Sequence, residues 1–342
     1  MNISDSERIS AVLDSIKYKM TPNINEADLI IVNMCSVRQP AVDRVHFLAH
    51  KFKKLKEKNP NFTTILTGCV LGKDKKAFAK GFDHVIDIKE IRKLPNLIAN
   101  ASEELLPSDY LDIAPKYSSK NIAYVPIMTG CNNFCTYCVV PHTRGREVSR
   151  PAEKIISEIK NLVKSGHKEI WLLGQNVNSY KNKNVNFPKL LKMVNDIPGD
   201  FTLNFTTSHP KDFSDELIKT MQNCKKLLKR LNLPIQSGDE KILKKMNRPY
   251  TAAQYKNLVK KIRKAIPDIS LSTDVIVGFP GETKKQFENT VKISKEIGFD
   301  LAFINKYSPR AGTAAAKLKD DVPWPEKKKR EKILIKLINE KE

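Results

Sequence analysis

Residues 123–138 read AYVPIMTGCNNFCTYC, and in this stretch an apolar segment leads directly to Cys131, Cys135 and Cys138. The segment Ala123–Met128 predicts a β-strand because it is short, apolar and followed by a glycine. Three cysteines on the loop after a strand are more typical of a metal site than of disulfides. The stretch therefore predicts a strand whose C-terminal end carries a metal centre.

Strand and helix patterns alternate from residue 121 to residue 325. After Ala123–Met128, we expect strands at Glu169–Gly174, Phe201–Thr206, Arg230–Ile235, Leu271–Val277 and Leu301–Tyr307. We expect helices at Pro151–Ser165, Pro188–Asp196, Phe213–Gln222, Tyr255–Ile266 and Lys284–Ile297. This alternation implies a parallel sheet with right-handed crossovers. We therefore predict an α/β fold with a partial (β/α)6 barrel over 121–325, whose active site lies at the C-terminal ends of the strands.

Residues 1–95 predict a smaller α/β domain. Its expected elements are helices at Ser4–Ile16 and Pro40–Lys58, and strands at Asp28–Asn33, Thr63–Thr67 and His84–Asp87. Cys35 and Cys69 each follow a strand, at the edge where ligands bind in open α/β sheets. Residues 96–120 contain prolines and serines with weak periodicity and are expected to be a linker. The segment 326–342 is expected to be a charged amphipathic C-terminal helix.

The longest apolar runs fall far short of the roughly 18 residues that span a bilayer. The first ten residues, MNISDSERIS, lack the apolar core of a secretory signal. We therefore expect a soluble, cytoplasmic protein with no membrane partner.

Charge points to a polyanionic partner. The chain has 60 Lys and Arg against 38 Asp and Glu, which gives a formal net charge of +22. Such a surplus favours nucleic acid because each Lys or Arg set against a phosphate releases counterions. The alternative is that many of these lysines are only solvated charge on helix faces, as in Lys51–Lys56.

The three-cysteine loop has a specific chemical interpretation. Its thiolates can hold three irons of a 4Fe-4S cluster and leave the fourth iron without a protein ligand. That iron can chelate the amino and carboxylate groups of S-adenosylmethionine, and reduction of the cluster can release a 5′-deoxyadenosyl radical. The alternative is a structural zinc site, for which His142 is the nearest additional ligand candidate. We expect no catalytic residue beyond the cluster ligands.

A series of short motifs runs almost from end to end of the chain. They are Asn33–Arg38, Thr67–Cys69, Cys131–Cys138 with Val140–Arg146 and Ser149–Pro151, Leu173–Asn176, Thr206–Pro210, Leu233–Gly238, Met246–Arg248, Asp274–Glu282 and Tyr307–Arg310. In this order and spacing they resemble the radical SAM methylthiotransferases, and within them the MiaB-type enzymes that modify tRNA.

The resemblance implies a site for S-adenosylmethionine at the ends of the barrel strands. Gly174, Gln175 and Asn176 would face the methionine ammonium, and Gln236 and Ser237 would face the ribose hydroxyls. Arg248 would pair with the cofactor carboxylate, and Gly278 and Phe279 would approach the adenine. The alternatives are tight turns at the glycines, a solvent-facing amide at Gln236, and a phosphate contact or a surface position for Arg248.

The resemblance also implies an auxiliary 4Fe-4S cluster, for which Cys35 and Cys69 match two of three ligands. The third cysteine would lie two residues upstream of Met1, and the first strand of this domain is also missing. The family normally continues into an RNA-binding TRAM domain, which we expect to be absent because the sequence stops at Glu342. RNA contact would then rest on Arg144, Arg146 and Arg150, whose alternative role is local ion pairing with Glu147 or Glu153.

By resemblance, the reaction is methylthiolation at C2 of N6-isopentenyladenosine at position 37 of tRNA, in the anticodon loop. Threonylcarbamoyladenosine in tRNA and an aspartate of a ribosomal protein are the alternative substrates. The expected partners are tRNA and an electron donor such as flavodoxin or ferredoxin, and the protein is expected to be monomeric. A hypothesis of another class is a zinc-bound RNA-binding protein or a truncated relic without catalysis.

Overall fold

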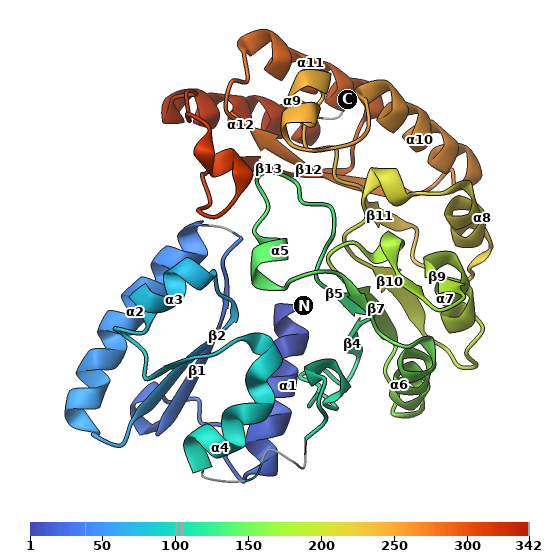
Figure 1. Ribbon diagram of the computed structural model, residues 1–342. Helices are drawn as coiled ribbons and strands as arrows, with labels where there is room; N and C mark the ends of the chain where they lie inside the picture. Colours follow the sequence, from blue (N-terminus) through green and yellow to red (C-terminus); the bar gives the residue numbers. More distant parts are fainter. Residues whose placement is uncertain (38, 100–101, 103–105, 341–342) are drawn as a thin grey trace. The chain divides into compact units, whose positions relative to one another are not determined.

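The computed structural model describes residues 1–37, 39–99, 102 and 106–340. The chain divides into two compact units, of which the first comprises Met1–Lys120 and Val139–Gly145. The second comprises Asn121–Cys138 and Arg146–Glu342. Figure 1 shows the helices and strands of each unit.

A three-stranded parallel sheet forms the centre of the first unit. Its strands lie in the order β1 (Leu29–Cys35), β2 (Thr63–Cys69) and β3 (His84–Val85). The helices of this unit are α1 (Asn2–Ser15), α2 (Gln39–Lys58), α3 (Gly72–Phe78), α4 (Leu94–Ala99) and the short α5 (Val140–Thr143). In the register of β1 and β2, Cys35 is paired with Cys69. The two cysteines therefore end neighbouring strands side by side.

Alternate residues of β2 pack on opposite faces of this sheet, as the pleat of a strand requires. Ile65 lies in one apolar cluster with Ile9 and Val12 of α1. Leu66 lies in a second cluster with residues of α2 that include Phe52. The sheet is therefore covered by α1 on one face and by α2 on the other.

The segment 96–120 was expected to be a linker, but its described residues 106–113 include part of the core of the first unit. Tyr110, Leu111 and Ile113 are buried in the cluster that contains α1. The Nη2 atom of buried Arg8 donates a hydrogen bond to the Leu111 carbonyl at 3.2 Å. These apolar residues lie between prolines without a helical or strand period, so periodicity could not identify them as core.

Six parallel strands form the second unit. One set lies in the order β4 (Ile122–Pro126), β7 (Glu169–Leu173) and β10 (Thr202–Phe205), and the other in the order β11 (Arg230–Asn232), β12 (Ser270–Val277) and β13 (Leu301–Lys306). Leu203 of β10 forms a parallel bridge with Leu227, just before β11, and joins the two sets. The predicted α/β fold with a six-stranded partial barrel is confirmed.

Helices follow the strands as the alternation predicts. They are α6 (Ala152–Lys164), α7 (Phe187–Asn195), α8 (Asp215–Asn223), α10 (Ala252–Ala265), α11 (Lys284–Ile297) and α12 (Trp324–Asn339). Capping boxes at Thr251 and Thr283 begin α10 and α11, because each threonine and the glutamine three residues later satisfy each other's backbone N–H groups. Within the described residues, no helix combines the length and apolar character needed to cross a lipid bilayer.

Several short elements were not predicted from the sequence. They are β5 (Met128–Thr129) paired with β6 (Val148–Ser149), the hairpin of β8 (Lys181–Asn182) and β9 (Val185–Asn186), and α9 (Glu240–Lys245). The 3-10 turns are η1 (Ile24–Glu26), η2 (Ile88–Lys93), η3 (Tyr110–Asp112), η4 (Val177–Ser179), η5 (Pro210–Asp212) and η6 (Ala314–Lys317). All are too short to produce a recognisable hydrophobic period.

Gly68, directly before Cys69, tests the packing of the first sheet. Its φ is +99°, and a Cβ atom there would lie 2.4 Å from both Asn33 Oδ1 and the Met34 carbonyl oxygen. Gly68→Ala should therefore lower the free energy of unfolding by about 2–4 kcal/mol, measured by urea denaturation. Gly72→Ala is the matched control, because a Cβ at Gly72 meets nothing within 4 Å. Equal stability of the two variants would contradict this packing.

Candidate active site

The loop with Cys131, Cys135 and Cys138 begins at the end of β5. Cys131 is buried, and the other two cysteines are half-buried. The backbone N–H of Cys138 donates to the Cys135 carbonyl at 2.9 Å, which closes a tight turn between these two residues. Phe134 has a left-handed φ of +47°, which is uncommon for an aromatic residue. The thiols are therefore presented by a compact, partly strained turn.

Contacts from the end of α9 hold this loop in place. The Asn247 side-chain amide donates to the carbonyl oxygens of Asn133 and Phe134, each at 3.1 Å. The Thr136 hydroxyl donates to the Lys245 carbonyl at 2.8 Å, and its backbone carbonyl accepts from Ala315 N at 2.8 Å. The cysteine loop is thus fixed by residues more than 100 positions later in the chain.

Zinc sites and 4Fe-4S sites need different sets of ligands. In the described part of the chain, no three Cys, His, Asp or Glu side chains are grouped closely enough to hold one metal ion. A structural zinc site needs four such ligands around one point. A 4Fe-4S cluster with one open iron takes three thiolate ligands, which is the number of cysteines that this loop carries.

Buried polar atoms without a hydrogen-bond partner lie just beyond four barrel strands. In the described residues they are Gln175 Oε1 and Asn176 Oδ1 after β7, Ser208 Oγ and His209 Nε2 after β10, Gln236 Oε1 after β11, and Tyr307 OH after β13. A buried polar atom without a partner is costly, so a group of them marks a place that a ligand or water completes. Because the C-terminal ends of parallel strands meet at one edge, this edge has the donor and acceptor atoms that a polar cofactor needs.

Two residues at the same edge have strained backbone conformations. Thr207 and Gln236 have φ values of +61° and +66°, in the left-handed region that β-branched and bulky residues rarely adopt. Hydrogen bonds to β12 hold Gln236, whose N–H donates to the Asp274 carbonyl and whose carbonyl accepts from Ile276 N. Such strain is typical of functional sites, where the surrounding structure enforces it.

Two residues predicted to contact the cofactor have packing roles. A Cβ atom at Gly174 would lie 2.6 Å from Met128 Cγ, so the glycine makes room for Met128. Phe279 is fully buried, and its ring packs edge-on against Tyr307 with 5.2 Å between ring centroids. Both observations concern side-chain space, so the predicted approach of the backbone to the cofactor stays a prediction at these two positions.

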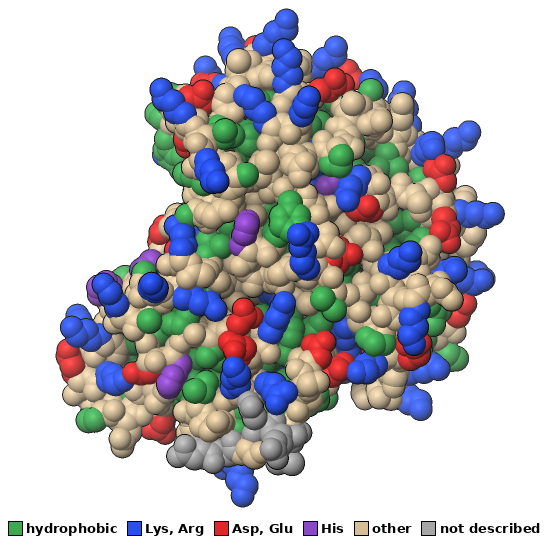
Figure 2. All heavy atoms as spheres, viewed as in Figure 1, with side chains coloured by type: hydrophobic (Ala, Val, Ile, Leu, Met, Phe, Trp, Pro, Cys, Tyr) green, Lys and Arg blue, Asp and Glu red, His purple; other side chains and the backbone are tan. Residues whose placement is uncertain are grey.

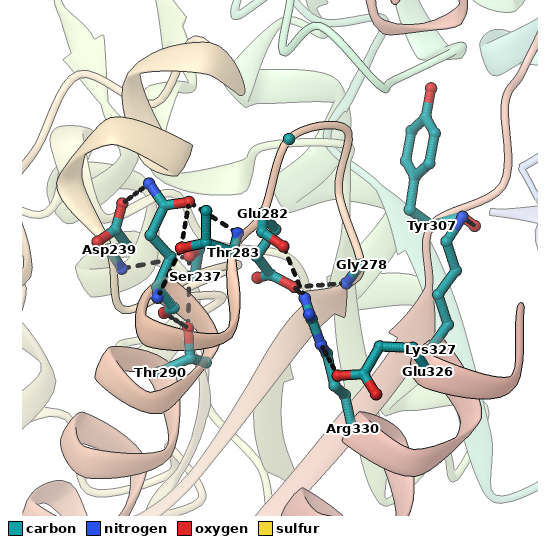
Figure 3. Close-up of polar contacts among 12 residues, drawn as sticks. Ser237, Asp239, Gly278, Glu282, Thr283, Thr290, Tyr307, Glu326, Lys327 and Arg330 are labelled. Carbon is teal, nitrogen blue, oxygen red and sulfur yellow. Dashed lines mark hydrogen bonds and ion pairs between the residues drawn. The ribbon is translucent and has the colours of Figure 1, made fainter. Parts of the chain in front are cut away.

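Ser237 also differs from its predicted role. It is fully buried, its hydroxyl accepts a hydrogen bond from the Asp239 N–H at 3.2 Å, and it lies 3.4 Å from the Thr290 hydroxyl. Figure 3 shows Ser237 between Asp239 and Thr290. These contacts position the start of α9 against α11, whereas Gln175, Asn176 and Gln236 keep unpartnered acceptors.

Arg248 lies beside the cluster loop, and its three side-chain nitrogens have protein partners. Its Nη1 lies 3.6 Å from Cys135 Sγ, its Nη2 donates to the Pro234 carbonyl at 2.9 Å, and its Nε donates to the Tyr250 hydroxyl at 2.9 Å. Nη1 and Nη2 each carry a second N–H, so the predicted pairing with a cofactor carboxylate stays a prediction. The buried guanidinium places a positive charge next to the Cys135 thiol.

The turn after β12 is tied to α12 by a buried ion pair (Figure 3). The Gly278 N–H and the Arg330 Nη1 both donate to Glu282 Oε2, each at 2.7 Å. Gly278 has a φ of +68°, and a Cβ there would lie 2.4 Å from Lys327 Cγ. The glycine predicted to approach adenine is thus required by Lys327, and α12 fixes the turn in which it lies.

A second group of sulfur atoms lies in the first unit. Arg144 Nε donates to Cys69 Sγ at 3.0 Å, and Arg144 Nη2 donates to Asp5 Oδ2 at 2.6 Å. Arg144 and Asp5 are almost completely buried. A hydrogen bond with the Cys35 thiol and burial raise the pKa of Cys69, whereas the Arg144 charge opposes this rise. Arg38, at the end of the motif that contains Cys35, lies outside the described residues.

Of the three arginines predicted to contact RNA, two are buried. Arg144 pairs with Asp5, and Arg150 Nη2 pairs with Glu158 Oε2 at 2.8 Å. Both guanidiniums are held within their own units, which corrects the prediction of phosphate contacts. Arg146 alone of the three is exposed, and it lies over the Phe134 ring at 4.3 Å.

Two family models match this chain. Residues 125–293 match the Radical SAM superfamily, and residues 1–88 match the Uncharacterized protein family UPF0004. Among solved structures, the radical S-adenosylmethionine methyltransferase TsrM from Kitasatospora setae aligns with a TM-score of 0.64 and 12% identity, over 91% of this chain and 73% of that chain. The cobalamin-dependent S-adenosylmethionine radical enzyme OxsB aligns with a TM-score of 0.61 and 12% identity, over 98% of this chain and 52% of that chain. At this identity the two structures support the fold only.

Relatives of much higher identity extend over nearly the whole chain. A tRNA-2-methylthio-N(6)-dimethylallyladenosine synthase of Clostridium novyi is 47% identical over 360 residues, which cover 99% of this chain and 79% of the relative. The enzyme of the same name from Thermoanaerobacter sp. is 43% identical over 359 residues, which cover 99% of this chain and 76% of the relative. The chain therefore belongs to the tRNA-2-methylthio-N(6)-dimethylallyladenosine synthase family of radical SAM methylthiotransferases.

Proposed function

We propose that this chain is a radical SAM enzyme that replaces the C2 hydrogen of N6-dimethylallyladenosine in tRNA with a methylthio group. The observation that carries this proposal is the three-cysteine loop fixed at a strand edge that also holds unpartnered buried polar atoms. Together with membership of the family, this edge supports a site for a 4Fe-4S cluster and S-adenosylmethionine.

Different side chains at this edge are proposed to hold the 4Fe-4S cluster and S-adenosylmethionine. Cys131, Cys135 and Cys138 are the proposed cluster ligands, and Arg248 Nη1 places a positive charge 3.6 Å from Cys135 Sγ. The amide oxygens of Gln175, Asn176 and Gln236 are available to accept hydrogen bonds from an ammonium or hydroxyl group. When bound, the cluster supplies the electron that cleaves the cofactor to an organic radical, which can break a C–H bond that acid–base groups cannot.

His209 contributes as a neutral group at the same edge. Burial, followed by the positive charges of Arg248 and Lys211, lowers the pKa of His209 to about 2. Its Nδ1 accepts a hydrogen bond from Lys211 N at 3.2 Å, so the proton of the neutral ring lies on Nε2. That Nε2 has no partner among the described residues. His209 can therefore donate to a ligand without bringing another charge into the site.

The auxiliary cluster is proposed to involve Cys35 and Cys69. Their adjacent positions at the ends of β1 and β2 bring two thiols together, and Arg144 provides a cation next to them. A buried cation stabilises the negative charge of metal-bound thiolate, and Asp5 limits the cost of burying that cation. This arrangement supports a place where inserted sulfur is held.

Contact with tRNA is supported by the charge of the chain. Lys and Arg side chains are spread over the face shown in Figure 2, and the net charge is +22. A single-stranded anticodon loop suits this chemistry because its bases can leave the stack at little cost. A flavodoxin or ferredoxin as electron donor, a monomeric state and a cytoplasmic location remain parts of this proposal.

Nucleoside mass spectrometry of tRNA from cells with and without the gene tests the substrate and the reaction together. Deletion should remove 2-methylthio-N6-dimethylallyladenosine and leave its precursor without sulfur. Wild-type protein should restore the methylthio nucleoside, and Cys131→Ala should not. Loss of a methylthiolated threonylcarbamoyladenosine would instead identify the alternative tRNA substrate, and an unchanged profile would refute the tRNA activity.

The ligand set can be tested by metal analysis. Replacing Cys131, Cys135 and Cys138 together by alanine should remove about four irons per chain after anaerobic reconstitution. Cys224→Ala is the control, because Cys224 is a buried thiol at the end of α8. The assignment fails if the triple variant binds as much iron and sulfide as the Cys224→Ala protein.

The His209 environment predicts a pH dependence of stability. Below about pH 6.5 the unfolded chain takes up a proton at His209 that the folded chain does not. This group therefore lowers the free energy of unfolding by about 1.4 kcal/mol per pH unit as the pH falls. His209→Asn keeps an acceptor for Lys211 N but does not titrate. Urea unfolding of the apoprotein should show a loss between pH 7.5 and 5.5 that is about 1 kcal/mol smaller in the variant, and an identical loss would contradict the shift.

A further inference from the structure

An aromatic ring on the cysteine loop is open to solvent and covered by an arginine. Phe134 is 37% exposed, although apolar rings are normally buried. The Arg146 guanidinium carbon lies 4.3 Å from the centroid of this ring. The pair therefore presents an aromatic face and a planar cation together, at the loop that holds the cluster thiols.

The fold holds both members of the pair in position. Phe134 keeps its strained φ of +47° because the Asn247 amide binds its carbonyl oxygen and that of the preceding residue. The backbone N–H next to Arg146, that of Glu147, donates to Asn132 Oδ1 on the same loop at 3.3 Å. A strained backbone that places an apolar ring on the surface costs free energy. Strain of this kind is found at functional sites, where the strained residue has a role.

Within the described residues, Arg146 contacts the Phe134 ring but forms no ion pair with a carboxylate. Arg144 and Arg150 are each paired with a buried or half-buried carboxylate, whereas the part of the chain described by the structure shows no ion pair for Arg146. Its neighbour Glu147 accepts from the Ser179 hydroxyl at 2.7 Å instead. Arg146 thus remains available to a partner outside this chain.

Nucleobases are the ligands that this combination fits best. Unstacked bases of single-stranded RNA stack on aromatic rings and on arginine guanidinium planes, and the arginine also attracts the phosphate backbone. The exposed position of Phe134 suits a base that flanks the modified adenosine, because the adenosine itself must reach the buried atoms at the strand ends. We propose that Phe134 and Arg146 form a stacking platform for a nucleotide adjacent to the target in the tRNA loop. This inference rests on the proposed function.

Phe134 and Arg146 are thus positioning residues that act by binding the RNA. Arg146→Lys keeps the charge and removes the planar group, while Phe134→Leu removes the aromatic face and Phe134→Tyr keeps it. Binding of a labelled anticodon stem–loop RNA should weaken on the order of tenfold in Phe134→Leu and several-fold in Arg146→Lys, and remain near wild type in Phe134→Tyr. The control is Arg230→Lys, an exposed arginine at the opposite, N-terminal end of β11.

RNA probes with a single abasic nucleotide identify the stacked base. One abasic position next to the target should weaken binding to wild type on the order of tenfold and cause no further loss in Phe134→Leu. Iron content is measured for every variant, and Phe134→Tyr separates loss of stacking from damage to the loop. Binding by Phe134→Leu and Arg146→Lys that equals that of Arg230→Lys would overturn the platform. Failure of the wild type to methylthiolate tRNA would instead refute the proposed function.

Discussion

Parallel pairing of the six strands of the second unit is the constraint on which the rest depends. The bridge between Leu203 and Leu227 joins two three-stranded sets, so that all six strands end at one edge. Every crossover returns the chain to the opposite edge, and the polar groups that follow β7, β10, β11 and β13 are therefore gathered at one end. The cysteine loop, which follows β4 and β5, joins the same edge. A site of this kind needs no single continuous motif, because topology collects its parts from positions 131 to 307.

Two buried ion pairs fix contacts between elements that the local sequence does not predict. Arg330 and Glu282 tie α12 to the turn after β12, and Arg144 and Asp5 form a comparable pair in the first unit. A buried pair is costly to break because it leaves one charge without compensation, so such pairs specify an arrangement more than they add stability. Each pair lies next to a proposed ligand site, where it fixes a turn or a thiol. Rigid surroundings of this kind allow strained residues such as Gln236 and Thr207 to persist.

The sequence predicts the fold well, because strands and helices have local patterns, and it identifies the three-cysteine loop as the proposed site of the cluster. The strands of the barrel are apolar runs between amphipathic helices, and the C-x3-C-x2-C spacing is specific. The contacts of individual side chains are harder to predict from the sequence. Arg144, Arg150 and Arg248 are cations in suggestive motifs, yet each has partners inside the protein. Asp5 and Cys135, which contact Arg144 and Arg248, lie far away in sequence, whereas Arg150 pairs with Glu158 of the helix that follows it. The same holds for Gly174 and Gly278, where glycine is required by Met128 and Lys327. Tyr307 and Ser208 were not candidates from the sequence, because only a buried polar atom without a partner among the described residues distinguishes them.

Cys131, Cys135 and Cys138 are proposed to hold a cluster whose open iron binds S-adenosylmethionine at the strand edge. This proposal can be tested by mass spectrometry of the products after the anaerobically reconstituted protein is reduced with dithionite in the presence of that cofactor. We expect 5′-deoxyadenosine and methionine in equal amounts, and neither of them from protein in which the three cysteines are alanine. Intact cofactor after reduction of an iron-loaded wild-type protein would contradict it.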